Sequence, residues 1–317
     1  MFAKANKFNI FERSKISIAE IDKELKVELS VLGGLDIFTN AHVVGVANNT
    51  AKICEAMGVG HELSKKCILG AYMHDVGKIK IPSNILQKTS KLTQEEYEIM
   101  KKHTIYGYEI CMRYDQFRYL APIARYHHEN LDGSGYPDGL TNEQIPEEAK
   151  LIKIADVWDA LTQKRQYKDG FKPSLAADII ISDVKKGKTG SKYLYYLLLC
   201  IIDEFIVKNK GNIKELREAK EHLVDLKDLD KIYKKIYDSG YSEALAKKLQ
   251  KYELPAGYDL SANTNLLTKT NQKIETLTKV IKETHDEINM LKKRCKEAKK
   301  LINPKEEWNV KLFGKRI

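Results

Sequence analysis

Six of the eight histidines in this chain lie between residues 42 and 128, and five of them occur in a pattern that strongly limits the fold. Two of the positions are doublets, His74-Asp75 and His127-His128. With two further histidines and one more aspartate they form a set of seven candidate metal ligands: His42, His74, Asp75, His103, His127, His128 and Asp156. Any one of these residues alone is more often a surface or satisfied core residue. The whole set indicates a common site, so the fold must bring residues 42 to 156 into one cleft.

The residues around this set favour helices. Seven prolines in 317 residues, long stretches without glycine or proline, and the lack of any sustained alternating pattern predict an all-α protein. Thr93-Gln-Glu-Glu96 has the pattern of a capping box and predicts a helix that ends near His103. The other expected helices cover about 38–57, 61–75, 118–129, 193–202 and the segment after Pro146 that carries Asp156, followed by two or three short helices in 213–251.

The doublets indicate a site for two metal ions. A carboxylate next to an imidazole offers two oxygens that can bridge two ions, and ions about 3.5–4 Å apart can hold both oxygens of a phosphoryl transfer. We assign Asp75 as the bridge. His42, His74 and Asp156 are expected on one ion, and His103, His127 and His128 on the other. Imidazole with carboxylate suits iron, manganese, zinc or nickel and does not suit calcium.

Basic residues near the set suggest an anionic substrate. Lys78 follows Asp75 by three residues, and Arg165 and Lys168 follow Asp156 within twelve. Each alone would more often be a surface residue, but three basic groups at such a site favour a phosphorylated ligand. The segment Asn130–Gly139 holds three glycines, which predict an irregular loop in which Asp132 makes a local turn.

The composition is that of an ordinary cytoplasmic protein. Five widely spaced cysteines form no CxxC pair, which fits a reducing cytosol. The N-terminus lacks the apolar region of a secretory signal, and the segment 193–202 is too short to span a bilayer. The net charge is +10, and residues 261–317 carry 14 Lys/Arg against 7 Asp/Glu. Such a basic segment is more often a solvated helix face than a nucleic-acid or lipid contact.

The C-terminal part repeats every seven residues. Leu260, Leu267, Ile274, Ile281, Ile288, Cys295 and Ile302 form one row, and Thr270, Leu277, Thr284, Leu291 and Ala298 form the second. This pattern predicts a coiled coil and with it a homodimer or a protein partner; the alternative is a helix packed on the chain's own body. The expected organisation is an N-terminal helical extension (1–35), a catalytic domain (36–210), a helical connector (211–259), the coiled coil (260–303) and a basic tail (304–317).

Three segments resemble the signature motifs of the HD-GYP phosphodiesterases, an all-helical group within the HD hydrolase superfamily. They are His74-Asp-Val-Gly-Lys-Ile-Lys-Ile-Pro82, His127-His-Glu-Asn-Leu-Asp-Gly-Ser-Gly-Tyr-Pro137 and Ile154-Ala-Asp-Val-Trp-Asp-Ala-Leu161. The resemblance covers about residues 36–210. It implies an HD-domain helical bundle that hydrolyses cyclic di-GMP to pGpG, and in some members on to GMP, through a hydroxide that bridges two iron or manganese ions.

The resemblance also implies roles for single residues. The seven residues above match the family's metal ligands. Asp75 and Lys78 are expected to act in catalysis, Lys78, Tyr136, Arg165 and Lys168 to bind substrate, and Gly133, Gly135, Tyr136 and Pro137 to form the loop that gives the group part of its name.

The chain departs from the family pattern at several positions. Phe38 stands where some members have a glutamate and hold three metals, which favours two metals here. Val43 and Gly45 replace the usual Ser and Arg after the first histidine, and Thr104 and Gln166 stand where proline is usual. Two other functions remain open: an HD-type phosphohydrolase of another nucleotide, or a catalytically silent scaffold that acts through its coiled coil. The complete ligand set disfavours the scaffold.

Overall fold

The computed structural model describes residues 37–163, 169–240, 242–250, 252 and 260–303, and these residues form an all-α protein as the sequence predicts. Within them the single β-type pairing is an isolated bridge between Asp132 and Thr141. The predicted helical extension (1–35) and basic tail (304–317), with Arg165 and Lys168, lie outside the described residues. None of the described helices has the length and apolar character needed to cross a bilayer.

The chain divides into two compact units, and the first takes in residues up to Ile201 together with those from Met290 onward. Its elements are α3 (Ile37–Met57), α4 (His61–Met73), η2 (Val76–Lys80), α5 (Ser83–Leu86), α6 (Gln94–Lys101), α7 (His103–Arg113), η3 (Asp115–Leu120), α8 (Ala121–Tyr126), α9 (Glu147–Thr162) and α10 (Pro173–Lys185).

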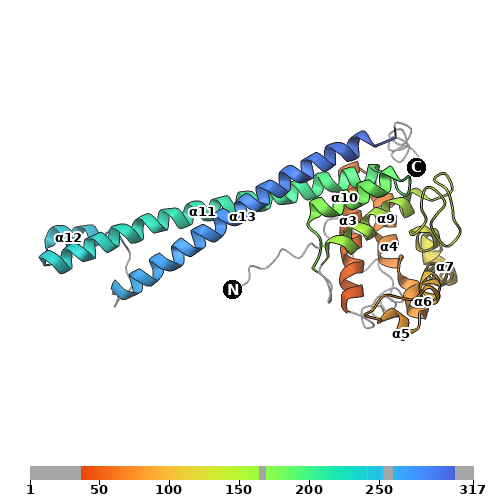
Figure 1. Ribbon diagram of the computed structural model, residues 1–317, viewed down its shortest axis with the longest axis horizontal. Coiled ribbons are helices and arrows are strands. Elements are labelled where there is room, and N and C mark those ends of the chain that lie inside the picture. Colours follow the sequence, from red (N-terminus) through yellow and green to blue (C-terminus); the bar gives the residue numbers. More distant parts are fainter. Residues whose placement is uncertain (1–36, 164–168, 241, 251, 253–259, 304–317) are drawn as a thin grey trace. The chain divides into compact units, whose positions relative to one another are not determined.

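Three helices form the centre of the first unit. α3, α4 and α9 contact one another, α8 packs on α4 and α9, and α7 packs on α8 and η2 (Figure 1). Ile53, Met73, Ile123 and Ile152 are fully buried between these helices. Burying an aliphatic side chain of this size stabilises a fold by roughly 1.5–3 kcal/mol, so this core holds the helix ends that carry the candidate ligands in place.

The predicted capping box is present at the start of α6. The hydroxyl of Thr93 accepts a hydrogen bond from the Glu96 backbone N–H at 3.3 Å, and Glu96 Oε2 accepts one from the Thr93 N–H at 2.7 Å. α6 ends at Lys101, and His103 begins a new helix, α7, instead of closing the old one.

The prediction of one helix over 118–129 is wrong. Residues 115–120 form the 3₁₀ segment η3, and α8 covers only Ala121–Tyr126, with Pro122 in its first turn. A proline has no N–H to donate and is best accommodated at a helix start, so a new helix begins there. His127 and His128 therefore lie in the turn after α8, not within a helix.

The prediction of short helices in 213–251 is also wrong. α11 runs without a break from Lys192 to Ser239 and is followed by α12 (Glu243–Leu249). Gly211 is the residue within α11 that most disfavours a helix. Its cost of about 1 kcal/mol relative to alanine is too small to end the helix.

The second unit comprises Ile202–Asn289, in which the later part of α11 and the first part of α13 (Leu260–Lys300) lie side by side (Figure 1). Lys273 of α13 pairs with Glu215 of α11 at 2.8 Å. The end of α13 belongs to the first unit, where Arg294 donates two hydrogen bonds of 2.8 Å to the carboxylate of Asp178 on α10.

The buried side of α13 follows the seven-residue repeat. Its buried members are Thr270, Thr284, Ile288, Leu291, Cys295 and Ala298, and Leu267, Ile274, Leu277 and Ile281 are half-buried. A single chain is enough to cover these positions, which agrees with the alternative that the helix packs on the chain's own body. The homodimer stays a prediction.

Candidate metal centre

The seven candidate ligands converge in the first unit as two groups, each with ligand atoms within 4.8 Å of one another. The first group consists of His42 from α3, His74 from the end of α4, and Asp156 from α9. The second consists of Asp75, His103, His127 and His128. The two groups have the same members that the sequence analysis assigned to two ions.

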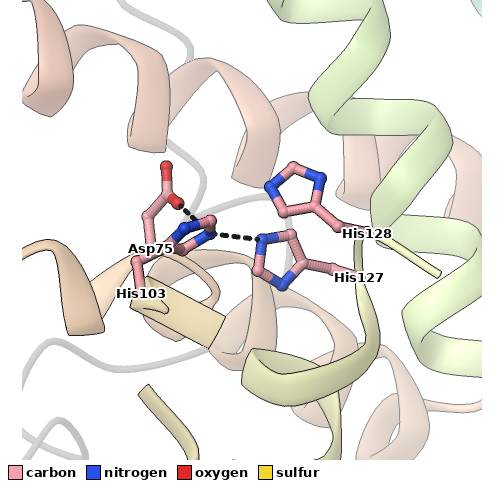
Figure 2. Close-up of side chains that lie close together, drawn as sticks. All are labelled: Asp75, His103, His127 and His128. Atoms are coloured by element: carbon pink, nitrogen blue, oxygen red, sulfur yellow. Dashed lines mark hydrogen bonds and ion pairs between the residues drawn. The ribbon is translucent and has the colours of Figure 1, made fainter. Parts of the chain in front are cut away.

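Asp75 lies between the groups, and its two oxygens face different ones. Its Oδ2 is 3.2 Å from His74 Nε2 and 4.0 Å from His42 Nε2. Its Oδ1 is 3.4 Å from His103 Nε2 (Figure 2). The His103 and His127 Nε2 atoms are 3.4 Å apart, so the second group closes around the same carboxylate (Figure 2). This is the placement required of a bridging carboxylate.

Three histidines are anchored to the backbone in the same way. The Nδ1 atoms of His74, His103 and His127 lie 2.6, 2.8 and 3.0 Å from the carbonyl oxygens of Ala71, Met100 and Ala124, each three residues earlier. A carbonyl oxygen can only accept, so Nδ1 carries the proton in each ring. Nε2 is then free to bind a metal, and metal-binding histidines are commonly fixed by such a contact.

His42 is anchored by side chains instead. Its Nδ1 lies 2.7 Å from Oδ2 of Asp159, and its Nε2 lies 3.0 Å from Oδ1 of Asp156. The two aspartates are one turn apart on α9 and face the same side. Both ring nitrogens of His42 are thus held from one neighbouring helix.

The two groups differ in their protonation. Burial lowers the pKa of His42, but the hydrogen bonds that Asp156 and Asp159 accept from its ring outweigh burial and raise that pKa to about 9. In the second group burial lowers the pKa values of His103 and His127, and it lowers the pKa of His128 to about 3. Burial would raise the pKa of Asp75, but the charge of Lys78 and contact with His74 hold it well below its usual range.

Two atoms at the centre of the site test whether the residues suit a metal. His74 Nε2 and Asp75 Oδ1 are buried and make no hydrogen bond with any described residue, although each lies within ion-pair distance of a neighbouring ligand candidate. Leaving a buried polar atom without a partner costs about 1–3 kcal/mol, more for a charged group. A divalent cation satisfies an imidazole lone pair and a carboxylate oxygen together, so the donor set fits metal ions.

Gly77 brings the residues of the second group together because it lets the backbone of η2 approach the backbone of α7 closely. A Cβ atom at Gly77 would lie 1.9 Å from the carbonyl oxygen of His103 and 2.4 Å from the N atom of Gly107. Only glycine lets η2 pack this closely on α7. In the structure Gly77 thereby brings Asp75 toward His103.

The glycine-containing loop folds back on the centre. The carboxylate of Glu129, which is 1% exposed, accepts hydrogen bonds from the N–H groups of residues 138, 139 and 140 at 2.7, 3.1 and 3.0 Å. Asp132 makes the expected local turn, accepting from the Ser134 N–H at 3.0 Å. The ring of Tyr136 lies over His128, with 4.8 Å between ring centroids.

Of the predicted substrate contacts, Lys78 and Tyr136 lie at the centre. Lys78 Nζ donates to Asp75 Oδ2 at 2.6 Å, and its side chain is 22% exposed. Asp159 and Glu129 were missed, although both lie inside the quoted motifs. The available signals were the three-residue spacing of Asp159 from Asp156 and the position of Glu129 directly after the histidine doublet.

Comparisons with known proteins identify a family for this chain and several relatives. The family model described as "HD domain" matches residues 16–191. The cyclic di-GMP phosphodiesterase response regulator RpfG of Xanthomonas campestris pv. campestris is 37% identical over 181 residues, which are 53% of this chain and 46% of that protein. The 3'3'-cGAMP-specific phosphodiesterase 2 of Vibrio cholerae is 36% identical over 194 residues, 60% of this chain and 37% of that protein.

A third relative is a cyclic di-GMP phosphodiesterase of Thermotoga maritima, 40% identical over 136 residues, which are 42% of this chain and 37% of that protein. The chain thus spans less than half the length of these curated relatives.

Proposed function

The chain belongs to the HD domain family and to its HD-GYP group, and from this premise we propose that it is a metal-dependent phosphodiesterase of cyclic dinucleotides. The relatives named as phosphodiesterases support the reaction class. We assign the activity to residues 36–210, which contain every candidate ligand. Among these relatives, cyclic di-GMP is the substrate named most often, and we propose its hydrolysis to pGpG, with GMP as a possible further product.

One observation carries this proposal: the two oxygens of the buried Asp75 face two separate groups of nitrogen and oxygen ligands. We assign one divalent ion to His42, His74 and Asp156, and a second to His103, His127 and His128, with Asp75 shared. Iron and manganese suit this mixture of imidazole and carboxylate. When bound, two such ions lower the pKa of water and offset the charge on phosphate oxygens.

The remaining roles belong to the chain's own side chains. Lys78 is half-buried and its ammonium group contacts Asp75, so that group can turn to a phosphate oxygen at the centre without a large movement. Tyr136 covers His128 from the loop that Glu129 holds. We assign Tyr136 to contact the substrate and to keep water away from one side of the centre. Arg165 and Lys168 stay proposed phosphate contacts.

A second substrate is favoured by a specific observation. The relative named as specific for 3'3'-cGAMP is 36% identical to this chain, close to the 37% of RpfG. A mixed cyclic dinucleotide is therefore the first alternative to cyclic di-GMP, and it would use the same metal centre.

The experiment is a hydrolysis assay on protein purified without oxygen and supplied with Fe(II) or Mn(II). Cyclic di-GMP and 3'3'-cGAMP are each incubated with wild type and with Asp75→Ala, and products are separated by chromatography. Linear dinucleotide from cyclic di-GMP with wild type alone is the expected result. Faster cleavage of 3'3'-cGAMP would select the alternative substrate. Bound metal without any product would reject both substrates, and neither metal nor product would favour the scaffold.

The predicted coiled coil bears on assembly. We propose that residues 260–303 serve a homodimer or a protein partner only if α13 exchanges its packing within the chain for an outside helix. Light scattering of the purified chain tests this, since a monomer at high concentration would reject the homodimer.

A further inference from the structure

Gly45 and Asp159 meet at the point where α3 crosses α9. Within the first unit Gly45 is half-buried, and Asp159 is buried, with 6% of its surface exposed. A Cβ atom at Gly45 would lie 1.9 Å from Asp159 Oδ1, 2.6 Å from its Cγ and 3.0 Å from its Oδ2. The carboxylate of Asp159 therefore occupies the space that any other residue at position 45 would fill.

The same carboxylate holds the imidazole of His42. Gly45 and His42 are three residues apart on α3, so both face α9. While Oδ1 of Asp159 fills the space at Gly45, Oδ2 accepts from His42 Nδ1 at 2.7 Å. Asp156, one turn earlier on α9, contacts the other ring nitrogen at 3.0 Å. The ring has no freedom to rotate without losing one of these contacts.

This contact differs from those of the other ligands. His74, His103 and His127 rest on carbonyl oxygens of the preceding turn, which exist in any helix. His42 depends on a side chain 117 residues away and on the absence of a side chain at position 45. The orientation of the His42 ring therefore depends on two positions together: an aspartate at 159 and a glycine at 45.

We propose that Asp159 is the positioning residue that aims His42 Nε2 at the first metal ion, and that Gly45 is required because it makes room for Asp159. The inference rests on the proposed metal centre. Residues that fix a metal-binding histidine typically change metal affinity 10–100-fold when they are replaced. Asp159→Ala and Gly45→Ala should both weaken Mn(II) binding by about this factor.

Gly45→Ala is the informative variant because it leaves Asp159 in the sequence. Alanine has the higher helix propensity, so α3 itself is not weakened. Gly211→Ala is the matched control: it is also a glycine inside a helix, and a Cβ atom there meets nothing within 4 Å. In the double variant Gly45→Ala/Asp159→Ala the obstructing carboxylate is absent, so Gly45→Ala should add no further loss.

Two measurements test the proposal on the full chain. Calorimetric titration of metal-free protein with Mn(II) gives the affinities. NMR of ring-¹⁵N-labelled metal-free protein shows whether His42 keeps its hydrogen-bonded Nδ1–H signal. We expect the signal in wild type, Gly211→Ala and Asp159→Asn, since an amide oxygen still accepts, and its loss in Asp159→Ala and Gly45→Ala.

An unchanged Nδ1–H signal or unchanged Mn(II) affinity in Gly45→Ala would overturn the inference and leave the proposed function intact. A further tenfold loss in the double variant beyond Asp159→Ala would also overturn it, because Gly45 would then act independently of the carboxylate. A wild-type protein that takes up no Mn(II) would instead reject the metal centre itself, and the inference with it.

Discussion

The two ligand groups are built from the same residue types, but the first contains one histidine, His42, that is held by different means. In the second group His103 and His127 are anchored to backbone carbonyls and surrounded mainly by other imidazoles. In the first group both ring nitrogens of His42 contact carboxylates from α9. Backbone anchors orient a ring without adding charge, whereas carboxylate anchors orient it and also attract a proton.

The protonation of the metal-free protein follows from this difference. His42, with a pKa raised to about 9, carries a proton near neutral pH and has to release it before Nε2 can bind a metal. His128, with a pKa lowered to about 3, is already neutral. In the first group a metal ion therefore has to compete with a proton for His42 Nε2, and in the second group no such competition occurs at His128.

Asp75→Ala breaks both groups at once and should have the largest effect. Because each group uses one oxygen of this carboxylate, we expect loss of bound metal and a fall in phosphodiesterase turnover of at least about 10³-fold, with the fold retained. Metal analysis and the chromatographic assay measure both. His61→Ala is the control, since His61 is exposed and pairs only with its neighbour Glu62 in the contacts described. Retained activity in both Asp75→Ala and His74→Ala would reject a two-metal centre.

His42→Ala and His127→Ala separate the groups. Each removes one ligand from one group, so we expect bound metal to fall from about two ions to about one, with hydrolysis lowered about 10²-fold or more. Metal content per chain after desalting checks this. Loss of both ions from either variant would mean that the groups are a single cooperative site, and the comparison above would fail.

The spacing of the motifs was enough to predict which candidate ligands come together, because each lies at a helix end or on a helix face set by local sequence. His74 and Asp75 follow α4 directly, and Asp156 falls within α9 as expected. The all-α class followed from the lack of alternating patterns. The predictions that failed concerned the bounds of helices. α8 begins only near Pro122, later than predicted, and α11 continues through Gly211 without a break.

The partners of the ligands could not be predicted from local sequence. Asp159 becomes informative only once α3 and α9 are known to cross, since it contacts a residue 117 positions away. Gly45 looked like a departure from the family pattern, and the structure gives it a reason in the space taken by Asp159. Glu129 acts on backbone groups of a loop whose path no periodicity describes.

The pH dependence of metal binding sharpens the comparison at a smaller scale. Between pH 6.5 and 9 the affinity of the first group for Mn(II) should rise roughly tenfold per pH unit, because one proton leaves His42 for each ion bound. The second group should change little in this range. Titrations in buffers of different ionisation enthalpy count the released protons, using His127→Ala to isolate the first group and His42→Ala to isolate the second. Equal proton release from both variants would contradict the difference in protonation.

The smallest effect is expected in the stability of the metal-free protein, where the two groups act in opposite directions. The pKa of His42 is raised in the folded state, so its contribution is complete below about pH 6.5 and is lost as the pH rises through 9. The pKa of His128 is lowered, so its contribution is present above about pH 6.5 and is lost as the pH falls toward 3. His42→Gln should therefore flatten the alkaline side of the stability profile, and His128→Gln the acid side, each by about 1–2 kcal/mol. Urea denaturation of chelator-treated protein at pH 5, 7 and 9 measures both sides. If both variants flattened the same side of the stability profile, the carboxylates of α9 would not give His42 and His128 different protonation. The first group would then bind its metal without the competition from a proton that we infer.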